Sequence, residues 1–324
     1  MWTWIRDSNS TNYNSMIPFS KNNAYILLLG LLVFLSTCQG NFSDDWELLF
    51  NGEDLDNWGL YLSVPDSSSE IPNWPKDSLG LYKGPLKDQD LLNVYSIDTL
   101  EGEPLLRVSG AVIGNLYTKA SYQNYHLKVQ FRWGEKKWSW MKGRPRDGGI
   151  LYHYNRIEGK GIRHELQIHE GDVGSYWAKH TWVDIPGEYT TDLPESIRSA
   201  QPYLRDIVPT LGDTLFRYNA ASPVQQFNGA PEWQICLANP YNENPLGQWN
   251  TLEILAFENH AVHLVNGQVN LVLLNARYQE GESLKPMNRG SIQIQSEGAE
   301  LFFKEIKLKP LDRMPKDIQD LLEN

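Results

Sequence analysis

Short segments in which apolar and polar residues alternate recur along this chain. Alternation over four to eight residues is typical of a β-strand with one buried face. The pattern predicts strands at 105–110, 125–133, 148–154, 164–170, 251–258, 261–274, 291–296 and 301–309. Asn266-Gly267, inside one of these segments, predicts a tight hairpin. Many short strands with little helix indicate an all-β fold, an antiparallel sandwich of two sheets.

The remaining segments predict a short C-terminal helix and long surface loops. Residues 315–324, PKDIQDLLEN, place Ile318, Leu321 and Leu322 on one helical face. Residues 63–90 and the interval 186–248 are rich in loop-forming residues, which predicts surface loops. In a sandwich such insertions usually lie at the rim of a binding face.

The first residues predict an export signal that is separate from the fold. Residues 24–35 form an apolar run that ends just before Ser36-Thr37-Cys38. A run of this length is short for a bilayer span and is typical of a secretory signal peptide, although an uncleaved anchor is the alternative. Leu35 to Cys38 resemble a bacterial lipobox. The sequence therefore predicts a signal peptide over 1–37, lipidation of Cys38, a tether over 38–45, a folded domain over 46–312 and a helical tail over 313–324.

Composition excludes one class of partner and suggests another. The net charge of −11 and the lack of a basic run argue against nucleic-acid binding. The chain has 12 Trp and 16 Tyr, whose rings could stack on the C–H faces of sugars or simply fill a β-core. With Cys38 acylated, Cys236 has no disulfide partner, and its apolar surroundings predict a buried, inert thiol.

Residues 161–177, GIRHELQIHEGDVGSYW, are the most informative stretch of the chain. Successive side chains of a strand point to opposite faces. Glu165, Gln167 and His169 would therefore share one face, while Leu166 and Ile168 point into a core. An acid, an amide and an imidazole on one face predict the floor of a binding cleft.

Several segments together resemble the 3-keto-disaccharide hydrolase domain family, formerly a domain of unknown function. The matching pieces are LFNGEDLDNW, NYHLKVQFRWG, RDGGILYHY, HELQIHEGDVGSYW, QWNTLEILAFENHAVHLVNGQ and GSIQIQSEGAELFFKEIKLKPL, spread over residues 46–310. The resemblance implies a concanavalin A-like jelly-roll β-sandwich, exported in bacteria, that cleaves glycosides already oxidised at C3 by a sugar 3-dehydrogenase. With the lipobox, this predicts a lipoprotein of the cell envelope in a Gram-negative-type bacterium, on the outer membrane and facing either side.

The chemistry that the resemblance implies needs three kinds of group. A C3 ketone acidifies the C2 proton, so its removal gives an enolate that expels the C1 substituent, and water then adds. Such a site needs a base, a donor or cation for the enolate, and an acid for the leaving oxygen. Glu165 is the first candidate for base or acid, with an ion pair to Arg163 as the structural alternative. His153 and His169 are candidate donors to the enolate oxygen, and His153 stands where the family often has Arg.

The sequence also suggests residues that would hold the substrate. Gln167 could bind sugar hydroxyls, Asp172 could bind a hydroxyl or shape its turn, and Tyr176 and Trp177 offer stacking faces. Arg163 and Arg146 are further candidates at the cleft, and Lys119, Arg132 and Trp133 are weaker ones at its rim. No cofactor is indicated with certainty. His153, Glu165 and His169 could hold a divalent metal, although they lack a tight metal-binding spacing.

Two other functions compete with a 3-keto-glycoside hydrolase. Jelly-roll glucanases use a Glu-x-Asp-x-x-Glu strand, whereas this chain has Glu165-Leu166-Gln167-Ile168-His169-Glu170. Gln167 replaces the middle acid, and Glu170 would point away from Glu165 unless a bulge intervenes. The second alternative is a surface lipoprotein that binds glycans without catalysis, because the same sandwich hosts many lectins.

Overall fold

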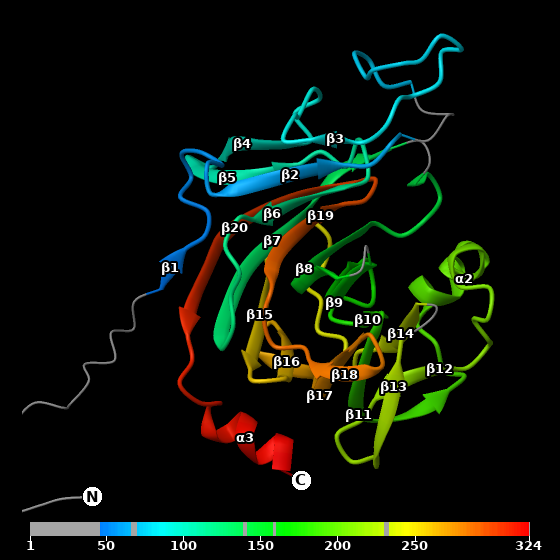
Figure 1. The fold of residues 1–324 in the computed structure, drawn as a ribbon, viewed down its shortest axis with the longest axis vertical. Coiled ribbons are helices and arrows are strands. Elements are labelled where there is room, and N and C mark those ends of the chain that lie inside the picture. The colour runs from blue at the N-terminus through cyan, green and yellow to red at the C-terminus, as the bar shows by residue number, and fades with distance from the viewer. Residues whose placement is uncertain (1–45, 66–69, 139–140, 158–159, 230–232, 324) are drawn as a thin grey trace, which may run out of the picture. The chain divides into compact units, whose positions relative to one another are not determined.

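The computed structural model describes residues 46–65, 70–138, 141–157, 160–229 and 233–323. The predicted signal peptide (1–37), the lipidation site at Cys38 and the tether (38–45) lie outside these residues. Strand pairing links the described strands continuously, and every pair is antiparallel except β12 with β14 (Figure 1). Among the described residues, no helix has the length and apolar character that crossing a bilayer requires.

The first of two large sheets carries the candidate site. Its strands, in spatial order, are β3 (Leu86–Lys87), β2 (Trp58–Leu62), β6 (Gly114–Thr118), β19 (Ser291–Ser296), β8 (Asp147–Ile157), β9 (Lys160–His169), β10 (Tyr176–Lys179), β14 (Gln234–Leu237), β12 (Leu215–Tyr218) and β11 (Thr181–Thr190).

The second sheet is antiparallel throughout, and a small third group of strands joins it to the first. The second sheet contains β4 (Tyr95–Leu100), β5 (Glu103–Val108), β20 (Ala299–Pro310), β7 (Tyr125–Lys137), β15 (Asn250–Phe257), β16 (His260–Val265) and β17 (Gln268–Glu280), with β1 (Glu47–Leu48) paired to β20. β17 continues into pairs with β18 (Ser283–Pro286) and β11, and β11 also pairs with β13 (Val224–Asn228).

Both sheets bury one face in a shared hydrophobic core. On β7, Leu127, Val129 and Phe131 are buried, while the intervening polar residues are half-exposed, as the alternation predicts. Leu166 of β9 and Ile294 of β19 belong to the same core. The predicted jelly-roll sandwich is thus confirmed. We call the side of the first sheet that points away from this core the outer face.

Three local predictions are confirmed. Asn266 and Gly267 both have positive φ, 50° and 79°, and join β16 to β17, as a two-residue hairpin turn requires. The C-terminal helix is α3 (Lys316–Glu323), and its Ile318 packs into the core. Cys236 is buried, and burial raises the pKa of its thiol, as expected for an inert thiol.

The prediction that 186–248 consists of loops is wrong. This interval contains the strands β12, β13 and β14 and the helix α2 (Glu195–Ile207). Ile197, Ala200 and Leu204 lie on one side of α2 and form a small second core with Trp177 and Ile235. α2 therefore covers the outer face of β10 and β14, beside which it lies in Figure 1. Pro202 inside the helix hid it, because proline removes a helical hydrogen bond.

β8 contains a bulge that changes which side chains face outward. Its register with β9 shifts between Tyr152 and Asn155, and His153 has a φ of 49°. One extra residue in a strand reverses the facing of those that follow. Gly290 lies against this bulge, so close that a Cβ there would stand 2.3 Å from the carbonyl carbon of His153.

Gly290→Ala should therefore destabilise the fold strongly, by about 2 kcal/mol or more, because the clash is with backbone that cannot rotate away. Thermal or urea unfolding measures the effect. Gly212→Ala is the matched control: like Gly290 it has no positive φ, and its Cβ would meet nothing closer than 3.9 Å. Equal stability of the two variants would contradict this account of the bulge.

Candidate active site

β9 sorts its side chains onto two faces, as the sequence predicts. Ile162, Leu166 and Ile168 lie in the core. Arg163, Glu165, Gln167 and His169 lie on the outer face and are nevertheless buried, with Glu165 only 3% exposed. Burying such groups is costly unless each finds a partner. The partners come from the neighbouring strands.

Cross-strand pairing places residues of neighbouring strands in three rows on the outer face. Glu165 pairs with Leu151 of β8 and Trp177 of β10, Gln167 pairs with Gly149, and His169 pairs with Asp147. A Cβ on Gly149 would lie 2.8 Å from Oε1 of Gln295 and 3.3 Å from Oε1 of Glu165. This glycine therefore leaves the space into which those two side chains fold.

Glu165 forms the ion pair that the sequence analysis named as the alternative to catalysis. Nε and Nη2 of Arg163 donate to its Oε2 at 3.3 and 3.2 Å. Burial raises the pKa of Glu165, and Arg163 only partly offsets this. The result is a carboxylate that is held in place and is more basic than a surface glutamate.

Lys179 of β10 is a second cation beside this carboxylate. It pairs in register with Arg163, and its Nζ lies 4.0 Å from the centre of the Trp233 ring, which also has the Arg163 guanidinium 5.0 Å away. Burial and the Arg163 charge lower the pKa of Lys179 to about 8, against the effect of Glu165, which raises it. The amine is therefore mostly protonated at neutral pH and loses its proton just above it.

Asp147 and Glu297 add two carboxyls to the outer face. Nε2 of Gln167 donates to Oδ1 of Asp147. Burial raises the pKa of Asp147 to about 7, against the effect of His169 and with that of Glu165. Burial, Asp147 and Glu165 all raise the pKa of Glu297. At neutral pH this end of the site can therefore hold a transferable proton.

His169 interacts electrostatically with three acids and bonds directly to one of them. Its Nδ1 donates to Oδ1 of Asp172, which is 1% exposed and also accepts from Oγ of Ser196 on α2 at 3.4 Å. Burial lowers the pKa of His169, but Asp172, Asp147 and Glu243 outweigh it and raise the pKa to about 9. The imidazolium therefore compensates a cluster of carboxylates.

The expectation that His153 faces the cleft is wrong. The bulge turns its side chain into the core, where it is 1% exposed and lies edge-on to Tyr125 and Tyr152. Burial lowers its pKa to about 3. Because the bulge shifts the alternation by one, Tyr154 rather than His153 reaches the outer face, where it lines a cavity.

The other predicted binding residues divide between the site and its surroundings. Tyr176 points into the core and hydrogen-bonds to Nδ1 of His164 at 2.8 Å, so the stacking face expected of it is wrong. Trp177 is on the outer face but is packed against Trp233 and the second core around α2. Arg146 forms an ion pair with Glu170 at 3.0 Å, beside the turn that follows β9.

The predicted metal set is not brought together. His153 lies on the opposite face of the sheet from Glu165 and His169. Within the described parts of the chain, no group of three His, Cys, Asp or Glu side chains could hold a metal ion.

The sequence analysis missed four residues of the site: Asp147, Lys179, Glu243 and Glu297. Alternation along DGGIL and YWAK places Asp147 and Lys179 on the outer face, and SIQIQSE does the same for Glu297. Glu243 carries no such signal, because it comes from a loop and accepts from Nε1 of Trp133 and the Gly171 amide, both at 2.7 Å.

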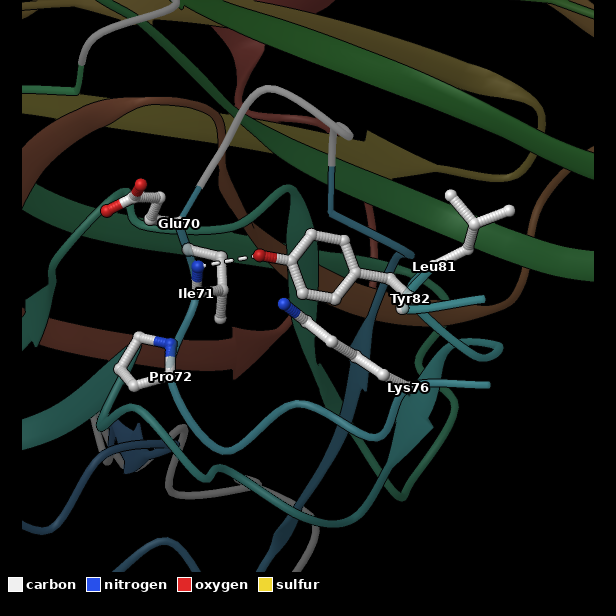
Figure 2. A pocket seen from close by; sticks show the side chains of 7 residues that line it. Glu70, Ile71, Pro72, Lys76, Leu81 and Tyr82 are labelled. Atoms are coloured by element: carbon white, nitrogen blue, oxygen red, sulfur yellow. Dashed lines mark hydrogen bonds between the residues drawn. The ribbon is translucent and has the colours of Figure 1, made fainter. Parts of the chain in front are cut away.

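A separate pocket of about 500 Å³ lies in the loop between β2 and β3 and holds little of this chemistry (Figure 2). Tyr82 points toward Ile71 and accepts a hydrogen bond from its amide at 2.7 Å. Nζ of Lys76 lies 4.8 Å from the centre of the Tyr82 ring. Among the described residues that line it, Glu70 and Lys76 alone are charged, so we place the candidate active site on the outer face of the first sheet.

The His169 network predicts a dependence of stability on pH. The folded protein binds a proton on His169 between pH 6.5 and about 9 that the unfolded chain does not, so this contribution is complete below 6.5 and lost as pH rises through 9. The free energy of unfolding of wild type should exceed that of His169→Gln, and this excess should be at most about 3 kcal/mol larger at low pH than at high pH. Urea unfolding of both proteins on the two sides of this window measures it, and the difference between them cancels the titration of Lys179. A constant difference would contradict the network.

Comparison with known proteins places this architecture in a family. Two solved structures from Parabacteroides distasonis, described as candidate glycosyl hydrolases, are 17% and 14% identical to the chain, both with a TM-score of 0.41. The first match covers 82% of this chain and 94% of the other, and the second covers 83% and 100%. A carbohydrate-binding module from Bacillus subtilis is 7% identical, with a TM-score of 0.34, over 66% of this chain and 91% of that one.

A comparison with curated protein sequences finds no match. Residues 45–309, which include every strand of the first sheet, match the 3-keto-alpha-glucoside-1,2-lyase-like domain. The chain therefore belongs to the 3-keto-alpha-glucoside-1,2-lyase-like domain family.

Proposed function

We propose that the protein cleaves glycosides whose sugar carries a ketone at C3, by proton abstraction at C2, elimination of the C1 substituent and addition of water. The observation that carries the proposal is the buried Glu165 carboxylate on the outer face, which forms an ion pair with Arg163 and lies near Lys179, the cross-strand partner of Arg163. The family match supports the same reaction class.

Glu165 is the proposed base. Its raised pKa favours acceptance of the C2 proton, and Arg163 keeps it ionised beforehand. As that proton leaves, the C2–H electrons form a C2=C3 bond and charge moves to the C3 oxygen. Arg163 and Lys179 are the cations available to stabilise this enolate, which is the role that the sequence analysis gave to His153 and His169.

Asp147 is the proposed acid for the second step. The enolate electrons re-form the ketone and make a C1=C2 bond, while the C1–O bond breaks and its electrons go to the leaving oxygen. With a pKa of about 7, Asp147 is partly protonated at neutral pH and can give that oxygen its proton. Water then adds across the C1=C2 bond of the enone.

The two alternatives are less well supported. Jelly-roll glucanases carry their acids on one strand, a pattern that this chain lacks, because Gln167 replaces the middle acid and donates to Asp147 and Glu170 is paired with Arg146. A protein that only binds glycans would not need buried acids and a lysine with shifted pKa values in one cleft.

The proposal has consequences for the protein's setting. A sugar 3-dehydrogenase must act first, because the C2 proton of an unoxidised sugar is not acidic. Lipidation at Cys38 would hold the enzyme in the cell envelope, where such a substrate would have to be delivered.

A 3-keto-glycoside and its unoxidised parent, incubated separately with the protein, test the reaction. We expect release of the aglycone from the keto form alone, and about 100-fold or greater loss of turnover in Glu165→Gln. Glu280→Gln, which removes an exposed acid from the end of β17, is the control and should keep full activity. Cleavage of the unoxidised parent would favour the glucanase, and binding without cleavage of either compound would favour a lectin. A chelator added to the same assay tests whether the reaction needs a metal.

His153→Asn should give the opposite result. Asparagine tolerates the positive φ at this bulge, but it leaves a gap in the core, so stability should fall by about 1–3 kcal/mol. The folded variant should turn over the keto substrate as wild type does, because residue 153 faces the core. Full stability with lost turnover would return His153 to the active site.

A further inference from the structure

A cavity of about 590 Å³ lies on the outer face next to Glu165. It adjoins the candidate active site, because Arg163 and Lys179, which line the cavity, also lie next to Glu165. Its other lining residues come mainly from β2, β3, β6, β8 and β19. We call it the basic cavity.

The charge of the basic cavity is opposite to that of the chain. Among the described residues, its lining includes Lys87, Lys119, Arg163 and Lys179 and no carboxylate, although the chain carries a net charge of −11. Cations and anions are therefore separated along the outer face. The basic cavity lies toward Arg163, and the carboxyls of Asp147 and Glu297 lie toward His169.

Most of this positive charge is not neutralised by ion pairs. Among the described residues, only Arg163 of the four cations forms one, with Glu165. Nζ of Lys119 donates at 2.8 Å to the backbone carbonyl of Asp56, which is an uncharged partner. Nζ of Lys179 lies over the Trp233 ring, and the nearby Glu165 carboxylate acts on it electrostatically and raises its pKa. Asp88 is close enough to add to the effect of burial in raising the pKa of Tyr117, but it does not line the cavity.

The rest of the lining suits a sugar. Tyr61, Tyr117 and Tyr154 supply aromatic rings. The Tyr117 ring lies directly over Gly59, where a Cβ would come within 2.3 Å of it, and a Cβ on Gly161 would lie 3.2 Å from the nearest ring carbon of Tyr154. These glycines let the rings lie close to the sheet. Asn115 also lines the cavity, and its buried Oδ1 has no hydrogen-bond partner among the described residues.

We propose that the basic cavity binds a sugar unit that carries a carboxylate or a sulfate group. This inference rests on the proposed function, since it makes that unit the neighbour of the keto sugar whose C2 lies at Glu165. Cations with few counter-charges favour an oxyanion, and the tyrosine rings and amides favour a pyranose. The substrate class is then an acidic oligosaccharide or glycoside.

Calorimetric titration of the unmodified protein with three unoxidised probes tests this. Methyl β-D-glucuronide and glucose 6-sulfate should bind about fivefold or more tightly than methyl β-D-glucoside, and the advantage should shrink in about 0.5 M salt. The tighter of the two anionic probes identifies the substituent. Because no probe carries a ketone, this outcome is independent of the keto-glycoside assay.

Charge variants locate the binding. Lys87→Gln and Lys119→Gln, both at exposed positions, should each weaken glucuronide binding by roughly two- to fivefold. Lys285→Gln on β18 removes the same charge outside the cavity and should have no effect. Equal affinity for all three probes, no binding by any of them, or an equal loss in Lys285→Gln would overturn the proposal.

Discussion

The burial of charged and polar side chains on the outer face of β9 is the constraint on which the site depends. Arg163, Glu165, Gln167 and His169 are all removed from most solvent, which is unfavourable unless charges and hydrogen bonds compensate. Each residue finds its partner close by. Arg163 and Glu165 pair within the strand, Gln167 bonds to Asp147 on β8, and His169 bonds to Asp172 in the following turn.

These partners compensate only part of the cost of burial, and the pKa shifts that result suit the site to acid–base chemistry. Glu165 and Asp147 keep raised pKa values and Lys179 a lowered one, because burial outweighs their partners. Acids and a lysine whose pKa values are shifted together on one face are typical of functional sites. Here the face holds a base and a proton donor at neutral pH, with cations next to the base. The same face separates cations from acids, which orients any charged substrate that enters.

Much of the fold and half of the site were predictable from local pattern. Alternation in the segments at 125–133 and 164–170 gave the correct inward residues, and the Asn-Gly pair gave the hairpin. The same rule failed at His153, because a bulge adds one residue to β8 and reverses the facing beyond it. The alternation rule also places Asp147 and Lys179 on the outer face, but the sequence analysis did not apply it to them. α2 was missed because Pro202 opposes a helix that is stabilised by packing on Trp177 and Ile235.

The sequence by itself determined which side chains of each regular strand share a face, because the two-residue period depends only on the backbone. It therefore also determined the polar outer face of β9. It also determined the chain's acidic balance and its family. Only the tertiary structure decided which polar residues meet. Glu243 is 72 residues away in sequence from Gly171, from whose amide it accepts a hydrogen bond, and Ser196 of α2 is 24 residues away from Asp172. The cations of the basic cavity come from four separate strands or strand ends. Such contacts depend on register, bulges and packing across the whole sheet, which no local pattern encodes.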